Sequence, residues 1–147
     1  MAIRESREVV VDSEPESILA VLADVAALPT WSAIHERVEV INRYEDGRPR
    51  HAEITIKNHG IRDRHVVEYH WGSDWMVWDA TRTNRQKAQH GEYHLTREGG
   101  RTRVRFDLVF EPVGVLPPVL FKRGAQAVIN SATEGLRNRL AQLKENT

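Results

Sequence analysis

Histidines and neighbouring carboxylates are the residues of this chain whose types and spacing could do chemistry. His90 and His94 flank Glu92 at alternate positions, and alternate residues of a strand share one face. With His70 on a neighbouring strand, the set suggests zinc, which needs three or four converging ligands. The strand pattern places this set on the solvated face, with no enclosing shell. We therefore interpret it as exposed polar side chains, and we predict no metal site and no cofactor.

His65 differs because it alternates with Val67 and Tyr69 on the apolar side of a strand. A buried histidine beside a tyrosine hydroxyl could act as an acid or base near neutral pH, so His65 is the candidate catalytic residue. The alternative is a half-exposed histidine near the sheet end that is hydrogen-bonded to the backbone or to Asp63. Tyr69 and Tyr93 suit the orientation of a bound polar group, or they are core rings with satisfied hydroxyls.

Composition and charge exclude several classes of function. The 21 Lys and Arg residues balance the 21 Asp and Glu residues. The basic runs at residues 48–64 and 97–105 are not interleaved with exposed aromatics, so we predict no nucleic-acid partner. The absence of cysteine excludes a disulfide scaffold and thiolate metal sites. The sequence also lacks Gly-rich phosphate loops, Walker motifs and nucleophile elbows.

The length of 147 residues fits a single domain spanning residues 1–147. Residues 1–16 contain no apolar run of signal-peptide length, and no later segment is apolar enough to span a bilayer. We therefore expect a cytoplasmic protein without integral membrane association. The sequence does not determine the oligomeric state.

Hydrophobic periodicity predicts the elements that position these residues. Residues 36–112 alternate with a period of two, which predicts a meander of six strands after an amino-terminal strand at residues 3–12. Between them, a capping box at Ser13–Glu16 predicts a short helix that Pro29 ends. Residues 117–143 carry apolar side chains at helical spacing and predict a long amphipathic helix. This segregation of helices from strands indicates an α+β fold with an antiparallel sheet.

Turn positions predict the strand registers, and the two-residue turns lie at residues 59–60, 72–73, 84–85 and 99–100. These turns pair Met76 with both Tyr69 and Tyr93. They also pair Ile54 with His65. The four registers agree with one another, and they place the aromatic and aliphatic side chains of the meander on one face.

The apolar face needs a cover, and the long helix is the obvious one. Such faces with a few polar groups line many small-molecule sites, and Ala125 and Ala132 leave room on the helix stripe. A filled core in which small residues pack against large rings would show the same pattern. The candidate ligand-binding residues are Ile54, Ile56, His65, Val67, Tyr69, Trp71, Met76, Trp78, Gln89, Tyr93, Phe106, Leu108, Phe121, Ala125, Val128, Ile129 and Ala132.

Several short motifs occur in an order that is typical of one family. They are Ser13–Glu16 followed by Leu22–Asp24, Leu28–Ser32, His90–Leu95, Arg101–Phe106 and Val115–Pro117. Over nearly the whole chain, these motifs resemble the START-like (SRPBCC) superfamily, whose helix-grip fold is shared with the birch-pollen allergen. Within it, the chain looks most like the bacterial polyketide cyclase/dehydrase and lipid transport family.

The resemblance implies a seven-stranded antiparallel sheet curved around a long C-terminal helix, with two short helices after the first strand. It also implies a hydrophobic cavity between the helix and the sheet. Members of the family include aromatic cyclases, quinone and lipid carriers, and toxin-type partners. No catalytic motif of the family transfers onto this sequence, and likeness of fold alone does not assign a function.

We expect a protein that binds or carries a hydrophobic small molecule, such as a lipid, an acyl chain or a polyketide. The first alternative is a cyclase or dehydratase in which His65 with Tyr69 or Tyr93 moves protons. The second is a protein-interaction module with an apolar patch near Trp31 and the loop at residues 113–116, so a protein partner stays open. That loop could also gate the cavity, and Trp31 could rim its mouth or pack the short helices onto the sheet.

Overall fold

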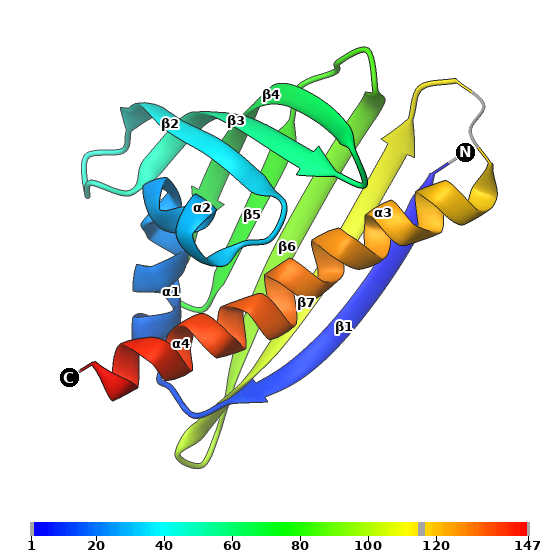
Figure 1. The fold of residues 1–147 in the computed structure, drawn as a ribbon. Helices are drawn as coiled ribbons and strands as arrows, with labels where there is room; N and C mark the ends of the chain where they lie inside the picture. The colour runs from blue at the N-terminus through cyan, green and yellow to red at the C-terminus, as the bar shows by residue number, and fades with distance from the viewer. Residues whose placement is uncertain (1, 115–116, 147) are drawn as a thin grey trace.

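A curved antiparallel sheet wraps around one long C-terminal helix, as Figure 1 shows. The computed structural model describes residues 2–114 and 117–146, without the side chains of Pro118 and Phe121. The sheet has seven strands in the order β1-β7-β6-β5-β4-β3-β2. The predicted α+β helix-grip architecture is therefore confirmed, and the sheet order places the first strand beside the last.

The strands of the sheet are β1 (Ile3–Val11), β2 (His35–Arg43), β3 (Pro49–Asn58), β4 (Ile61–Trp71), β5 (Trp75–Ala80), β6 (Gln86–Glu98) and β7 (Arg101–Pro112). The helical segments are α1 (Pro15–Ala23), the short 3₁₀ turn η1 (Val25–Ala27), α2 (Leu28–Trp31), α3 (Pro118–Asn130), the π-helical turn η2 (Ser131–Gly135) and α4 (Leu136–Glu145). In the described part of the chain, no helix has the length and apolar character needed to cross a bilayer.

Most of the predicted registers are confirmed. Tyr93 of β6 pairs with Met76 on one side and with Phe106 on the other. Ile54 pairs with His65 across the β3–β4 hairpin. Because side chains alternate along each strand, these pairs put the predicted aromatic and aliphatic residues on the face that the helix covers.

The predicted register of the β4–β5 hairpin was wrong by two residues. Met76 pairs with Trp71, whereas the turn position predicted a pair with Tyr69. The backbone N–H of Gly72 donates to the carbonyl oxygen of Trp75 at 2.9 Å, which closes the turn at residues 73–74. A shift of two keeps every side chain on its predicted face, because strand side chains alternate with a period of two.

The short helices begin differently from the prediction. Glu14 is the N-cap of α1 and makes no side-chain cap bond, so the predicted capping box does not form. The carbonyl oxygen of Ser13 instead accepts a hydrogen bond from Thr102 Oγ1 at 2.6 Å, which ties this turn to β7. Pro29 lies in the first turn of α2, where a missing N–H costs little. It therefore helps to start a helix where we predicted that it ends one.

Three segments, α3, η2 and α4, follow one another as the predicted long helix (Figure 1). The π-helical turn η2 in its middle was not predicted. Near it, the Tyr93 hydroxyl donates to the Ala132 carbonyl oxygen at 2.8 Å, and Thr133 Oγ1 donates to the Ile129 carbonyl oxygen at 2.7 Å. Single π-helical turns occur frequently at functional sites. Here the turn contains one of the hydrogen bonds that join the helix to the sheet.

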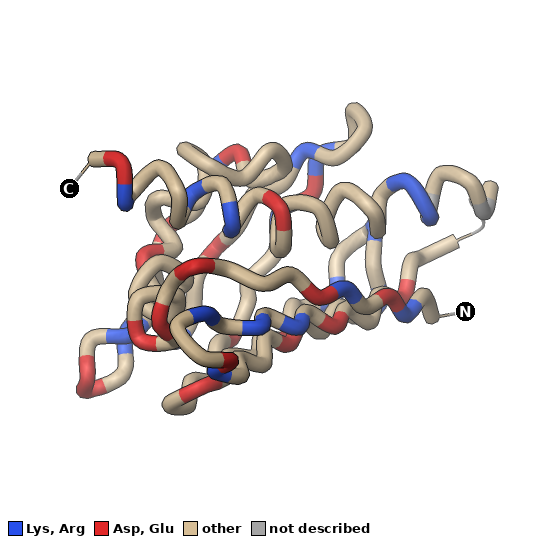
Figure 2. Tube along the Cα trace, turned by 90° about the horizontal axis from the view of Figure 1, so that it is seen from below, with Lys and Arg blue, Asp and Glu red and all other residues tan. Residues whose placement is uncertain are grey.

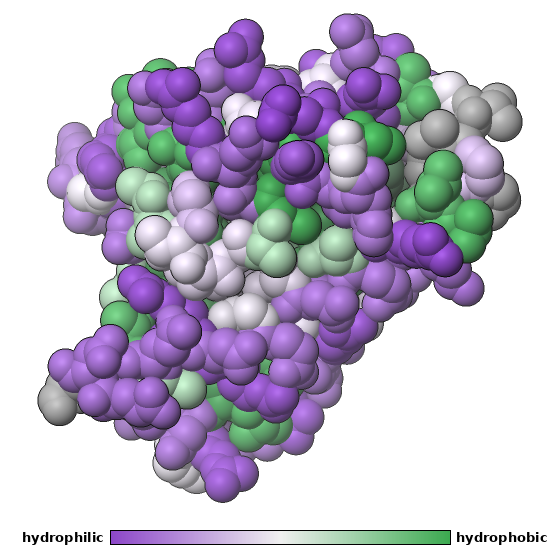
Figure 3. Space-filling view, viewed as in Figure 1, coloured by the Kyte–Doolittle hydropathy of each residue, from purple (hydrophilic) through white to green (hydrophobic). Residues whose placement is uncertain are grey.

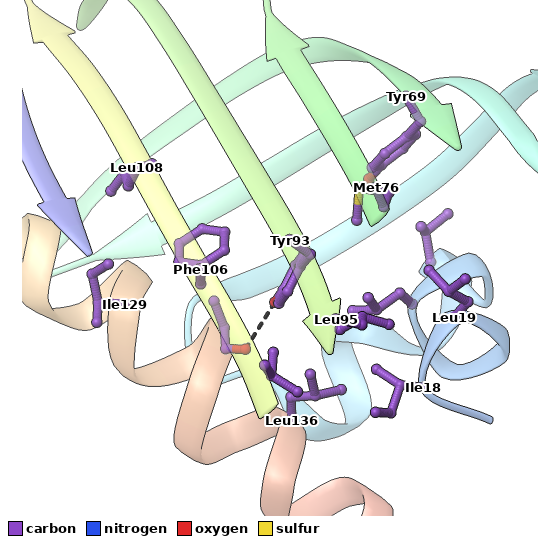
Figure 4. Close-up of a cluster of buried hydrophobic side chains, with 14 of the residues drawn as sticks. Ile18, Leu19, Tyr69, Met76, Tyr93, Leu95, Phe106, Leu108, Ile129 and Leu136 are labelled. Atoms are coloured by element: carbon purple, nitrogen blue, oxygen red, sulfur yellow. Dashed lines mark hydrogen bonds between the residues drawn. The ribbon is translucent and has the colours of Figure 1, made fainter. Parts of the chain in front are cut away.

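The helix and the sheet meet directly on one side only. Phe106 and Leu108 of β7 are buried close to Ile129, as Figure 4 shows. Tyr69 and Met76 lie farther from the helix, on the β4–β5 side of the sheet (Figure 4). Phe106 and Ile129 therefore fill the core beneath β7, whereas the helix and the β4–β5 part of the sheet are farther apart.

Charged residues are spread over the molecule with both signs interspersed, as Figure 2 shows. On the outer face of the sheet, Arg103 pairs with Glu98 at 2.6 Å and with Glu8 at 3.2 Å. Arg97 reaches Glu16 of α1 at 2.7 Å. Arg97 and Arg103 of the last hairpin are thus paired with carboxylates, as on a solvated charged face.

Candidate functional site

A small inner cavity lies between the sheet face, the short helices and the π-helical turn. Its volume is about 70 Å³. A water molecule takes up roughly 30 Å³ of liquid, so this space would hold about two waters. The lining residues are Leu22, Val25, Leu28, Trp31, Ser32, Ile34, His35, Ile54, Ile56, His65, Val67, Tyr69, Met76, Trp78, Gln89, Tyr93, Val128, Ser131 and Ala132.

Two histidines belong to this lining, the half-buried His35 and the buried His65. Ser32 Oγ and His35 Nδ1 lie 2.6 Å apart and share a hydrogen bond. His65 is only 5% exposed, and its Nδ1 is buried without a hydrogen-bond partner, 3.8 Å from Asp63 Oδ2. The predicted alternative of a half-exposed, hydrogen-bonded His65 is therefore wrong. The reason is that β4 directs this side chain inward, where it is paired across the hairpin with Ile54.

Burial keeps the ionisable groups of the inner cavity uncharged near neutral pH. It lowers the pKa of His35 to about 4, and repulsion from His65 acts in the same direction. Burial also lowers the pKa of His65, against a smaller opposing effect of the Asp63 carboxylate. The pKa values of the Tyr69 and Tyr93 hydroxyls are raised by burial. The cavity wall thus offers neutral hydrogen-bonding groups.

The aromatic floor of the inner cavity depends on one glycine. The Trp78 ring lies over Phe106 with centroids 5.5 Å apart, and its centroid is 6.2 Å from that of Tyr93. Gly91 is the cross-strand partner of Trp78, and a Cβ at this glycine would sit 2.3 Å from Trp78 Cζ2. Only a residue without a side chain therefore lets the indole lie flat against β6.

A larger outer cavity of about 350 Å³ lies beside the first half of α3. This volume falls at the low end of the roughly 300–1,000 Å³ range of ligand pockets. Its lining residues are Ile56, Asn58, His59, Ile61, Asp63, Asn84, Arg85, Gln86, Gln89, Leu108, Phe110, Val113, Gly114, Leu120, Gly124, Ala125 and Val128.

Three side chains line both cavities and so form the partition between them: Ile56, Gln89 and Val128. The tip of the β3–β4 hairpin is held against α3 at the edge of the outer cavity, because Asn58 Nδ2 donates to the Gly124 carbonyl oxygen at 3.0 Å. The other amide atom of this side chain, Oδ1, is buried without a partner. The two cavities therefore adjoin, with two aliphatic side chains and one amide between them and a polar contact at the rim.

The profile of the family described as "Polyketide cyclase / dehydrase and lipid transport" matches residues 2–146. The chain belongs to this family. The match covers almost the full sequence, so the resemblance inferred from the short motifs is confirmed. No curated protein matches the sequence significantly.

Solved structures of the same fold cover nearly all of the chain. A START superfamily protein from Mycobacterium smegmatis has a TM-score of 0.85 at 20% identity, over 95% of this chain and 98% of that chain. The aromatase/cyclase Zhui from Streptomyces sp. R1128 has a TM-score of 0.76 at 15% identity, over 95% and 96%. A major latex-like protein from Panax ginseng has a TM-score of 0.65 at 11% identity, over 89% and 95%. These likenesses show the fold, and with the family they indicate a hydrophobic ligand-binding fold of the START and polyketide-cyclase type.

Most of the predicted ligand-binding residues lie on one of the two cavities of this family fold. The predicted residues that line the inner cavity alone are Ile54, His65, Val67, Tyr69, Met76, Trp78, Tyr93 and Ala132. The outer cavity receives Leu108 and Ala125, and the partition contains Ile56, Gln89 and Val128. The side chain of Phe121 lies outside the described residues, as do Val115 and Leu116 of the predicted gate loop.

Three predicted residues line neither cavity. Trp71 stands at the end of its strand, where its Nε1 donates to the Pro49 carbonyl oxygen at 2.8 Å. Phe106 is fully buried beneath the Trp78 ring, and Ile129 is buried in the filled part of the core. All three residues support the wall of the site without lining it. The sequence could not show this, because strand and helix periodicity do not distinguish a lining residue from one in the layer beneath.

Sequence reasoning missed the contribution of the short helices and of the segment that follows them. Leu22, Val25 and Leu28 face the inner cavity together with Ile34 and His35. The apolar spacing of the first two was visible in the sequence, but nothing local shows that this helix caps a sheet end. His35 immediately follows the short helical region and precedes an exposed, charged stretch, so no pattern marked it as buried.

The histidines of the outer sheet face form a chain of hydrogen bonds with carboxylates. His90 lies 2.6 Å from Asp79 and 2.8 Å from Glu92, which in turn lies 2.8 Å from His94. Partial burial opposes protonation of His90, but these hydrogen bonds outweigh it and raise its pKa. Within the described residues, no group of three or more His, Cys, Asp or Glu could hold a metal ion.

Exposed apolar side chains gather where α3 begins, as the green patch in Figure 3 shows. Val119 is 55% exposed and Leu120 is 43% exposed, and Leu120 also lines the outer cavity. Trp31, which we expected at an interaction patch, at a cavity rim or between the short helices and the sheet, lines the inner cavity and is half-buried. A protein partner stays a prediction.

Proposed function

We propose that this protein binds or carries a hydrophobic small molecule in the two adjoining cavities between the sheet and the C-terminal helix. The observation that carries the proposal is the outer cavity of about 350 Å³, whose lining is largely aliphatic and aromatic. Burying the apolar surface of a ligand there is favourable by roughly 25 cal/mol per Å² removed from water. Membership of the family supports the same function.

The sizes of the cavities suggest how such a ligand lies. The outer cavity accommodates the body of the ligand, and the inner cavity of about 70 Å³ accommodates one end of it. The partition between them consists of side chains with rotatable bonds. Rotamer changes at Ile56, Gln89 or Val128 would join the two spaces without movement of the sheet.

A filling substitution tests the proposal. Val128 lines both cavities, whereas Val119 on the same helix is exposed. We expect the neutral dye Nile red to bind saturably with an increase in fluorescence, and we expect Val128→Phe to weaken this binding at least tenfold. Val119→Phe, which adds the same ring outside the cavity, should leave the affinity unchanged.

Circular dichroism and thermal unfolding must show that both variants are folded. Equal weakening by the two substitutions, or the absence of saturable binding by the native protein, would contradict a ligand site between helix and sheet. Denaturing mass spectrometry of the purified protein provides an independent readout, since a co-purified apolar compound should be lost from the Val128→Phe variant only.

His65 supports a second candidate function, a cyclase or dehydratase that moves protons in the same cavity. Its ring lines the inner cavity and lies 3.8 Å from Asp63 Oδ2, which accepts a hydrogen bond from Thr83 Oγ1 at 2.9 Å. A neutral imidazole backed by an oriented carboxylate is suited to general base chemistry. Electrostatic positioning and exclusion of water would provide most of the acceleration.

Turnover of a poly-β-ketone substrate tests this second function. His65→Gln should abolish cyclisation while Nile red binding persists, because glutamine retains hydrogen-bonding atoms but does not titrate. The expected loss is about 10²–10⁴-fold in kcat, as for removal of a general acid or base. Unchanged turnover in this variant would remove His65 from the mechanism.

A further inference from the structure

The inner cavity contains buried polar side chains that no protein group satisfies. Tyr69 is 4% exposed and Gln89 is 8% exposed, and both line this cavity. Among the described residues, Trp31 Nε1 and His65 Nδ1 of this lining are buried without a hydrogen-bond partner. The Tyr69 hydroxyl and the Gln89 amide also make no hydrogen bond to the described part of the chain, and only the Tyr69 carbonyl oxygen accepts one, from the Tyr44 hydroxyl. Leaving buried polar groups unpaired costs free energy, so such groups commonly mark the place of a ligand or of ordered water.

Tyr93 provides the contrast on the same wall. Its hydroxyl donates to the Ala132 carbonyl oxygen at 2.8 Å, so this tyrosine is already satisfied by the helix. Figure 4 shows the two rings in the same cluster, with Tyr93 directed to the helix and Tyr69 lying beside Met76 instead. Of the two tyrosines that line the inner cavity, Tyr69 is therefore the one with a hydrogen bond left to donate to a ligand.

Charge distinguishes the inner from the outer cavity. No Lys, Arg, Asp or Glu lines the inner cavity in the described part of the chain. His35 and His65 are uncharged near neutral pH because burial lowers the pKa of each ring. A carboxylate placed there would be buried without a countercharge, which is strongly unfavourable. The outer cavity, in contrast, is lined by Arg85 and Asp63.

We propose that the ligand is an apolar molecule whose inserted end carries a neutral oxygen, a carbonyl or a hydroxyl, that accepts a hydrogen bond from the Tyr69 hydroxyl. This inference rests on the proposed function, and it names the chemical class that the site prefers. Gln89 belongs to the partition, because it lines both cavities, and it contributes a second hydrogen bond to the same oxygen or its neighbour. The small size of the inner cavity suits one such group and excludes a bulky head.

A pair of chain compounds that differ only at one end tests the proposal. Dodecan-2-one and dodecanoate, added near neutral pH, compete with Nile red for the native protein. We expect the ketone to displace the dye at a concentration at least tenfold lower than the carboxylate. We also expect Tyr69→Phe, which removes one oxygen, to weaken ketone binding about fivefold, the value of one net hydrogen bond.

Tyr44→Phe is the matched control, because it removes a tyrosine hydroxyl that lines neither cavity. It should leave the preference for ketone over carboxylate intact, and both variants must show native circular dichroism. The proposal would be overturned if dodecanoate bound as tightly as the ketone and Arg85→Gln weakened dodecanoate binding. Such a result would mean that the hydrocarbon chain enters the inner cavity and that the carboxylate stays in the outer cavity.

Equal ketone affinity in the Tyr69→Phe variant and the native protein would also overturn it. Both of these results leave the proposed function standing, since Nile red and the chain compounds would still bind. Failure of Nile red, ketone and carboxylate alike would instead contradict the proposed function itself.

Discussion

At the scale of single residues, the site is a set of neutral polar groups held within an apolar wall. Tyr69 and Tyr93 are both buried, yet only Tyr93 is bonded to the helix. The two histidines lie in the same environment without charge. The difference between the two tyrosines is whether a protein group accepts a hydrogen bond from the hydroxyl, and within the described chain none does so for the Tyr69 hydroxyl.

Gly91→Ala should destabilise the protein and disturb the aromatic wall. The new Cβ would lie 2.3 Å from the Trp78 ring, so the indole has to move away from Phe106. Overpacking of this kind costs about 1–3 kcal/mol of unfolding free energy, measurable by urea denaturation. Gly100→Ala is the control, because nothing lies within 4 Å of its added methyl group. Equal stability of the two variants would contradict the close approach.

Stability should fall as the pH is lowered toward 4, in part because of His35. Burial first, and repulsion from His65 second, lower its folded-state pKa from 6.5 to about 4. Between these values the unfolded chain binds more protons, so the free energy of unfolding rises with pH across this window and levels off above it. His35→Gln keeps a side chain that can bond Ser32 but does not titrate.

We therefore expect denaturation of the His35→Gln variant to depend less on pH between about 4 and 6.5. Across this window the native protein should lose as much as about 3 kcal/mol more unfolding free energy than the variant, at about 1.36 kcal/mol per pKa unit. A variant whose stability follows that of the native protein at every pH would show that His35 is not held neutral by the fold.

The sequence predicted the residues of the wall better than their roles. Alternation along the strands placed His65, Tyr69, Gln89 and Tyr93 on one face, and all four line the inner cavity. Which hydroxyl the helix satisfies was not predictable, because that depends on where Ala132 lies after the helix docks. Periodicity predicts the face on which a side chain lies but not which element packs against that face.

At the scale of elements, the hairpin tips and the helix together define the site. Turn residues predicted three of the four registers, and the error at β4–β5 arose because Gly72 ends the strand before the turn proper. The π-helical turn η2 has no signature in the local sequence. The contact between this turn and the Tyr93 hydroxyl of β6 depends on packing between elements that are distant in sequence.

Asn58→Ala should loosen the edge of the outer cavity. The amide of Asn58 holds the β3–β4 hairpin tip to the Gly124 carbonyl oxygen of α3 at 3.0 Å. Without this bond, backbone amides of the tip should exchange with deuterium faster, and Nile red should associate and dissociate faster. The neighbouring contact of His59 with the Arg123 carbonyl oxygen, at 3.3 Å, remains in the variant. Unchanged exchange and unchanged dye kinetics would show that this contact does not control access.

At the scale of the whole molecule, the sheet is in contact with the helix on one side and stands away from it on the other. Phe106 and Ile129 fill the first side (Figure 4). The two cavities lie beside this filled part, and Leu108 lines the outer one. The sequence predicted the α+β class, the curved sheet and the covering helix. It left open whether the interior is hollow, since small residues opposite large rings occur both in filled cores and in pockets.

Methyl NMR of the protein during titration with Nile red tests the central claim most directly. A bound aromatic dye shifts the signals of the methyl groups next to it. We predict saturable shifts at Ile56, Val128 and Met76, which line the cavities, and none at Ile41, which is 56% exposed on β2. Shifts confined to exposed methyl groups such as Ile41, or no saturable shifts at all, would contradict a ligand site between the sheet and the helix.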